Sequence, residues 1–104
     1  MSNFEFNWKY EDFEIRTHSA STDKPYIELV KWDGKSGGKK SCYVLAFFHW
    51  NREEGGEWNF VGNRPFEAIA DIQIDIIWKQ MWYAAKMFVD WREKEEEKLE
   101  KEYF

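Results

Sequence analysis

The chain has 104 residues, of which 34% are charged and 43% hydrophobic, a balance that predicts one globular domain over residues 1–104. A formal net charge of −5 argues against a strong nonspecific electrostatic grip on nucleic acid, which needs clustered Lys and Arg. A single cysteine excludes an intrachain disulfide, and no apolar run approaches the ~18 residues that a membrane span requires. The N-terminus lacks the basic start and apolar run of a signal peptide, so we expect a cytoplasmic protein.

The first segment, "FEFNWKY", places aromatic residues on alternate positions, which predicts a strand. In "FEIRT" the apolar residues Phe13 and Ile15 fall on the other parity. A bulge or a short break at Glu11–Asp12 would keep both sets on one side of a sheet. Residues 26–32 and 42–50 flank the turn "DGKSGGKK" and predict a hairpin, and "EWNFV" follows the loop "NREEGG" as the partner of a second hairpin.

From Pro65 onward the spacing changes to steps of three and four, which predicts a helix. Its stripe consists of Ala70, Ile74, Ile77, Met81, Ala84, Ala85, Phe88 and Trp91. Asn63 is placed to cap this helix. The alternation in "DIQIDII" leaves a fifth strand open as the alternative for residues 66–77, although helix is favoured. The fold class is therefore α+β, with an antiparallel sheet of about four strands (about 3–62) packed against one long C-terminal helix (about 66–102).

The strand "CYVLAFFHW" is apolar on both faces, and such a strand is normally covered on both. The helix can cover one face, and the small residues Cys42 and Ala46 indicate which one. We expect the other face to present Tyr43, Phe47 and His49 with Trp32 alongside, an aromatic surface typical of protein contacts.

A helix over residues 66–102 would be about 55 Å long, whereas a strand of seven or eight residues spans about 25 Å. The acidic end of the helix should therefore overhang the sheet and end in two aromatic residues that invite a partner. For the acidic tail itself, a solvated, fraying helix end is the favoured interpretation, and the partner-binding overhang is the alternative.

The residue patterns of the common catalytic and metal sites are missing. The turn "GKSGGKKS" fails the spacing of a phosphate-binding loop and precedes a strand rather than a helix. Cys42 and His49 lie seven residues apart on one strand, which places them on opposite faces and excludes a catalytic dyad. No Cys/His cluster has zinc-ligand spacing, so we expect no catalytic residues, no cofactor and no metal.

The segment "FVGNRPFE", followed by an acidic, Trp-rich helix with "FVDW" near its end, resembles small uncharacterised proteins of phages and prophages of Gram-positive bacteria. The resemblance covers the second half of the chain and brings no site residues with it. It implies an accessory protein in the host cytoplasm that binds and inhibits or redirects a host protein, and some proteins of this kind imitate DNA.

We therefore expect a non-enzymatic protein-interaction module whose partner is a host protein or a second copy in a homodimer, with no membrane involved. The alternative is single-stranded nucleic-acid binding through an aromatic sheet face. The candidate partner-binding residues are Trp32, Tyr43, Phe47, His49, Glu93, Glu96, Glu97, Glu100, Tyr103 and Phe104.

Overall fold

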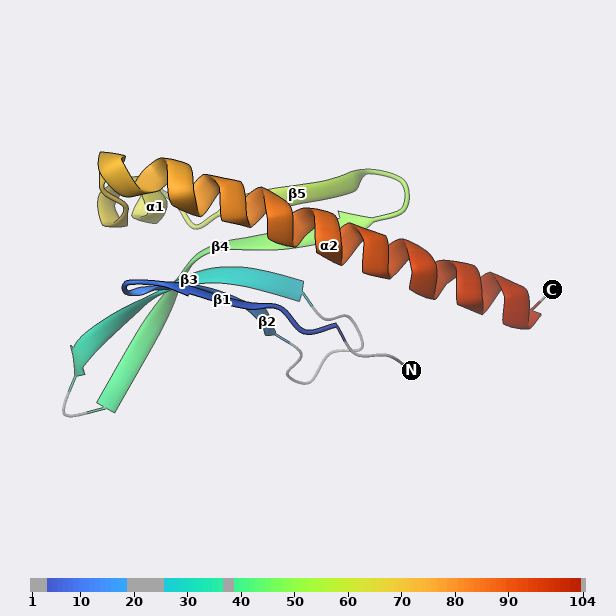
Figure 1. Cartoon of the computed structure of the whole chain (residues 1–104), viewed down its shortest axis with the longest axis horizontal. Coiled ribbons are helices and arrows are strands. Elements are labelled where there is room, and N and C mark those ends of the chain that lie inside the picture. Colours follow the sequence, from blue (N-terminus) through green and yellow to red (C-terminus); the bar gives the residue numbers. More distant parts are fainter. Residues whose placement is uncertain (1–3, 19–25, 37–38, 104) are drawn as a thin grey trace.

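The computed structural model contains one antiparallel sheet and two helices (Figure 1). It describes residues 4–18, 26–36 and 39–103, without the side chains of 18, 35–36, 39–40 and 99–103. The elements are β1 (Asn7–Tyr10), β2 (Phe13–His18), β3 (Tyr26–Ser36), β4 (Lys39–Asn51), β5 (Gly55–Phe60), α1 (Arg64–Ala68) and α2 (Asp71–Tyr103). The strands lie side by side in chain order, so the α+β class with an antiparallel sheet and a long C-terminal helix is confirmed.

The sheet has five strands where about four were expected, because the chain reverses at Glu11–Asp12 instead of continuing through a bulge. Tyr10 pairs with Phe13, and Glu11 has a positive φ of 53°. This tight turn makes β1 and β2 a hairpin and places the alternate aromatic residues of both strands on one face. The parity change in the sequence therefore marks a turn.

A bulge in β4 changes which residues share a face of the sheet. Leu29 of β3 pairs with Ala46, but the next residue, Val30, pairs with Val44. Leu45 is thus the extra residue, and it is fully buried. Strict alternation along residues 42–50 is therefore broken at the centre of the strand.

The single helix expected from residue 66 is interrupted at Ile69, whose backbone is extended (φ −101°, ψ 118°). Residues 71–77 belong to α2, so the preference for helix over a fifth strand is confirmed for that segment. Pro65 lies in the first turn of α1 as expected, but the Asn63 side chain makes no capping hydrogen bond. Gln73 instead accepts a hydrogen bond from the N–H of Ala70 at the start of α2.

The core lies between α2 and one face of the sheet. Ile27 and Leu29 of β3 and Phe48 of β4 meet Ile77, Met81, Ala84, Ala85 and Phe88 of α2 there. The indole N–H of Trp58 donates a hydrogen bond of 3.1 Å to the backbone carbonyl of Met81, which fixes β5 beneath the helix. The buried stripe of α2 follows the spacing of three and four that the sequence predicts.

The molecule is elongated, with principal extents of 52 × 29 × 21 Å. The C-terminal part of α2 projects past the strands, as Figure 1 shows, so the expected overhang is present. Of the nine-tenths-buried residues described, the last in sequence is Phe88, fifteen positions before α2 ends at Tyr103. Within the described residues, neither helix combines the length and the apolar character needed to cross a membrane.

Candidate interaction surface

The expected site on the second sheet face is divided by the bulge. Tyr43 pairs with Lys31 and lies on the helix side of the sheet, where the Arg64 guanidinium of α1 is 5.9 Å from its ring centroid. Lys31 donates a hydrogen bond to the carbonyl of Ala68 at the end of α1. The prediction that Tyr43 shares a surface with Phe47 and His49 is therefore wrong, because Leu45 shifts the alternation by one residue.

Phe47 and His49 do lie together on the face opposite α2. Their ring centroids are 4.9 Å apart, and Tyr26 lies 6.3 Å from His49. With Glu28, these rings line a hollow of about 390 Å³. Among the described residues no helix covers this face, and His49 is exposed there, but Val30 and Glu28 on the same face are buried, so the expectation of an uncovered second face holds only in part.

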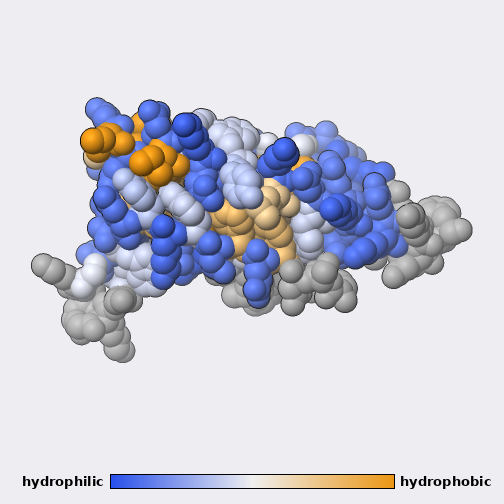
Figure 2. Space-filling model, in the orientation of Figure 1, coloured by the Kyte–Doolittle hydropathy of each residue, from blue (hydrophilic) through white to orange (hydrophobic). Residues whose placement is uncertain are grey.

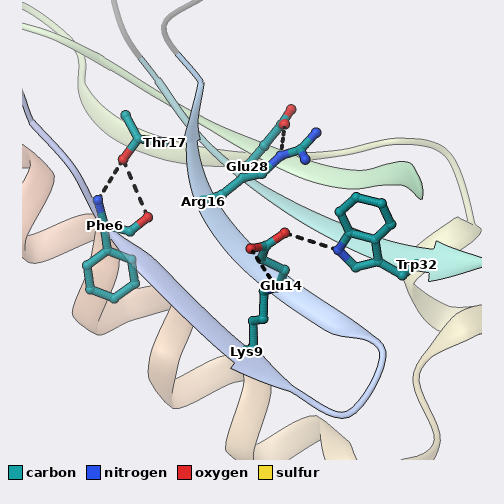
Figure 3. A network of polar contacts seen from close by, with 7 residues as sticks. All are labelled: Phe6, Lys9, Glu14, Arg16, Thr17, Glu28 and Trp32. Carbon is teal, nitrogen blue, oxygen red and sulfur yellow. Dashed lines mark hydrogen bonds and ion pairs between the residues drawn. The ribbon is translucent and has the colours of Figure 1, made fainter. Parts of the chain in front are cut away.

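The same face carries charged groups instead of a continuous aromatic surface (Figure 3). The Nε of Arg16 is 2.7 Å from Oε1 of Glu28, and these residues pair directly across β2 and β3. Trp32 donates a hydrogen bond of 3.0 Å from its indole to Glu14, which also lies 3.9 Å from Lys9. Trp32 is therefore held in a polar network over β2, apart from Phe47 and His49.

Burial makes the Arg16–Glu28 pair the firmest part of this network. The Glu28 side chain is 3% exposed and that of Arg16 is 29% exposed. Burial alone would lower the pKa of Arg16, but the hydrogen bond and charge of Glu28, with smaller contributions from Cys42 and Glu14, raise it above its ordinary value. A raised pKa for a cation means that its stabilising contribution is present at neutral pH and is lost only far above it.

Cys42 lies opposite Trp32 in the β3–β4 register, which places it on the face opposite α2. Cys42 and His49 therefore share a face, contrary to expectation, since the bulge lies between them. They remain seven residues apart along β4, which still separates them by roughly 20 Å.

The glutamates expected on the overhang lie on a largely solvated helix. Glu93 and Glu97 are exposed, and Glu96 is 3.8 Å from Arg52 of the β4–β5 loop. The side chains of Glu100 and Tyr103, and all of Phe104, lie outside the described residues. Glu93, Glu96 and Glu97 are spaced three and four apart, so they lie on one side of the helix, with Arg92 and Lys94 at its borders.

A different aromatic surface, which the sequence reasoning missed, lies beside the start of α2. Four rings follow one another in contact, from Phe66 of α1 to Phe60 of β5, then to Trp78 and Trp82 of α2. Their successive centroids are 6.3, 6.4 and 5.8 Å apart. Phe66 is 71% exposed and Trp82 is 48% exposed. We call Phe60, Phe66, Trp78 and Trp82 the aromatic row.

A small apolar cavity opens beside the aromatic row. It measures about 180 Å³ and is lined by apolar side chains, including Pro65, Ile69, Ile74 and Met81. It is smaller than the ~300 Å³ at which small-molecule pockets begin, so it suits one inserted apolar side chain. The break at Ile69 creates this space, because it turns α1 away from the line of α2.

A second set of exposed apolar side chains lies on the other flank of α2, separated from Trp78 and Trp82 by the charged outer side of the helix. Ile72 is 86% exposed, and Ile76, Tyr83 and Met87 are also exposed on the flank that faces β1. Figure 2 shows strongly hydrophobic side chains gathered over the end of the molecule where α1 and the start of α2 lie, whereas the overhang is hydrophilic. Exposed apolar patches are typical of contact sites in soluble proteins.

The signal for the aromatic row was present in the sequence. Trp78 and Trp82 are four residues apart, and each lies one position after a member of the buried stripe, Ile77 or Met81. An adjacent residue is displaced by about 100° around a helix, so two such residues form a second stripe on the flank. The contribution of Phe60 and Phe66 required the tertiary structure.

The described residues hold no group of three or more His, Cys, Asp or Glu placed to bind a metal ion. No family model, curated protein or solved structure matches the chain. The arrangement of side chains is therefore the basis for assigning a function.

Proposed function

We propose that the protein is a non-enzymatic protein-interaction module that docks a protein partner on the aromatic row and the adjoining cavity. The single observation that carries this proposal is the continuous contact of four partly exposed rings from β5, α1 and α2. Trp and Phe supply large contact areas at low entropic cost, and exposed clusters of them are typical of binding hot spots.

The position of the row supports docking over simple solvent exposure. Trp78 stacks on Phe60 with an interplanar angle of 14°, and Trp78 and Trp82 meet edge to face at 77°. Rings ordered by one another lose little further freedom when a partner covers them, so binding costs less conformational entropy. The cavity beside them offers a seat for one anchoring side chain.

The nucleic-acid alternative has less support. On the face with Phe47 and His49, the cations Arg16 and Lys9 are already engaged by Glu28 and Glu14. This face therefore offers little free positive charge to the phosphates of a bound strand. Oligonucleotides should therefore leave the tryptophan fluorescence unchanged at low salt, and salt-dependent quenching would favour the alternative.

The biological form of this proposal is an accessory protein of a phage or prophage that binds and inhibits or redirects a host protein in the host cytoplasm. The resemblance of the second half of the chain to such proteins supports this form. The acidic overhang is not required for it, because the aromatic row lies at the opposite end of α2.

Affinity capture from a lysate of the host cell, with quantitative mass spectrometry, tests the docking surface. We compare the natural chain with the double variant Phe66→Asp/Trp82→Asp, whose two side chains are exposed and whose fold should persist by circular dichroism. The bound host protein should fall at least tenfold with the double variant.

The matched control is Phe47→Ala/His49→Ala, which removes two rings from the opposite face of the sheet. This control should retain the captured protein. If capture survives the double variant and is lost with the control, the docking surface lies on the sheet face opposite α2, and the proposal is refuted.

A further inference from the structure

A stripe on the outer flank of α2 has opposite charges at its two ends and indoles between them. Its residues are Asp75, Trp78, Trp82 and Lys86, separated by three, four and four positions. This spacing places all four on one side of the helix. All four side chains are exposed, the two indoles by nearly half of their surface.

The two charged ends are unpaired in the part of the chain that the structure describes. Among the described residues neither Asp75 nor Lys86 forms an ion pair, whereas Arg16, Lys9, Arg52 and Lys98 each have one. The eleven positions between Asp75 and Lys86 correspond to about 16 Å along the helix, so they cannot pair with each other. Each is available to a partner that carries the opposite charge.

The stripe is complementary to an antiparallel copy of itself, because its two ends carry opposite charges and its centre carries two indoles. If a second helix of the same sequence lies antiparallel, with a two-fold axis between Trp78 and Trp82, each Trp78 meets Trp82 of the second copy. The same axis brings Asp75 of each chain to the level of Lys86 of the other. A two-fold interface requires this kind of self-complementary surface.

We propose that the occupant of the aromatic row is a second copy of this chain, in a two-fold dimer with antiparallel α2 helices. This inference rests on the proposed docking function and names its partner. An antiparallel arrangement also sends the two overhangs to opposite ends of the dimer. Residues 93–103 contain six glutamates and three lysines, so a parallel pair would bring two acidic segments together.

The available surface is adequate for a dimer contact. A buried aromatic side chain covers about 150–250 Å², so four half-exposed rings offer roughly 400 Å² per chain. A standard interface buries about 800 Å² per partner. The rings therefore supply about half of the required area, and Ile74, Lys79 and Lys86 lie next to them to supply more.

Size-exclusion chromatography with light scattering and sedimentation equilibrium measure the first consequence. The natural chain should approach twice its monomer mass of 12.7 kDa as concentration rises. Trp82→Asp should raise the dimer dissociation constant at least tenfold while its circular dichroism stays unchanged. The matched control Phe47→Ala, on the opposite face of the sheet, should dimerise like the natural chain.

A charge exchange tests the antiparallel register. Asp75→Lys alone and Lys86→Asp alone each place like charges together and should weaken the dimer about tenfold. The double variant Asp75→Lys/Lys86→Asp should restore the natural dissociation constant. Because the two residues cannot meet within one chain, rescue requires contact between copies, and failure of rescue would overturn the register.

The outcomes separate this inference from the proposed function. A natural chain that stays monomeric at every concentration overturns the dimer, and host-protein capture that depends on Trp82 would then still support docking. A dimer that Trp82→Asp leaves intact overturns the inference as well, because the contact would lie elsewhere. Loss of the dimer in Trp82→Asp, with its rescue by charge exchange, supports this inference. Loss of capture in the same variant supports docking, and the second copy and the host protein then compete for the aromatic row.

Discussion

Arg16 and Glu28 show how burial sets the importance of a single charged residue. They pair directly across β2 and β3, but Glu28 has only a tenth of the exposure of Arg16, at 3% against 29%. A charge left without its partner costs more when it is more deeply buried, because water cannot replace the lost interaction. The two halves of this ion pair should therefore respond differently to mutation.

Arg16→Met should lower the free energy of unfolding by about 3 kcal/mol, because it leaves the buried Glu28 carboxylate without a counter-ion. Glu28→Gln should cost only about 1 kcal/mol, because the Arg16 guanidinium keeps access to water. Chemical denaturation of both variants at neutral pH measures the difference. If both variants lose the same free energy of unfolding, the loss comes from the broken ion pair itself and not from the different burial of its two partners.

The pKa of Arg16 predicts how the stability of the natural protein depends on pH. Since the pKa of Arg16 is raised, the charge on Arg16 is kept at neutral pH and is lost only well above it. Deprotonation of Arg16 should therefore make no contribution to a change in stability between pH 6 and pH 9. The difference between the two variants should accordingly persist across this range.

The β1–β2 hairpin turns through a residue that is poorly suited to its backbone conformation. Glu11 adopts a φ of 53°, a region that favours glycine because a Cβ atom is crowded there. Its carboxylate accepts a hydrogen bond from the Gln73 side chain of α2, and both groups are exposed. The hairpin therefore combines a local strain with a weak tertiary contact.

Glu11→Gly should raise the free energy of unfolding by about 0.5–1 kcal/mol, because relief of the positive φ outweighs one exposed hydrogen bond. Gln73→Ala, which removes the same hydrogen bond and keeps Glu11, is the matched comparison and should lower it by less than about 0.5 kcal/mol. Thermal unfolding of both proteins tests this. If Glu11→Gly is the less stable of the two, the contact with α2 is what holds the turn.

The break between α1 and α2 determines which aromatic side chains lie together at the surface. A continuous helix from residue 64 would carry Phe66 along the axis of α2. The extended backbone at Ile69 instead sets α1 beside β4 and β5, where Lys31 binds its last carbonyl and Phe66 meets Phe60. The aromatic row therefore depends on this interruption.

The whole molecule divides into a packed half and a projecting half. The nine-tenths-buried residues described in α2 reach only to Phe88, and Arg52–Glu96 is an exposed ion pair. Exposed pairs contribute at most about 1 kcal/mol. Most of the stability should therefore come from the part of α2 that lies over the sheet.

Removal of residues 98–104 should change the free energy of unfolding by less than about 1 kcal/mol, because it removes no described buried side chain. Phe88→Ala, in the packed half, should by contrast cost about 3–5 kcal/mol. Urea denaturation compares the two proteins. A loss of several kcal/mol on truncation would mean that the overhang packs against the fold.

Much of the architecture followed from the sequence alone. The alternation of residues 4–10 and 13–17, the two hairpin turns and the spacing of three and four after residue 70 each reflect local geometry, and the structure contains the corresponding strands and α2. The buried stripe of α2 was also predicted correctly, from Ile77 to Phe88. These features depend on residues close together in the chain, so local periodicity is sufficient to reveal them.

Tertiary structure decided where the surfaces lie. The bulge at Leu45 and the extended residue Ile69 arise where strands and helices must fit a common core, and neither has a distinct local pattern. The bulge shifts the alternation of β4 by one residue, which places Tyr43 on the helix side. The extended Ile69 turns α1 away from α2, which brings Phe66 beside Phe60 and Phe60 beside Trp78. Local sequence thus determined which elements form, whereas the packing of distant segments determined which side chains remain exposed together.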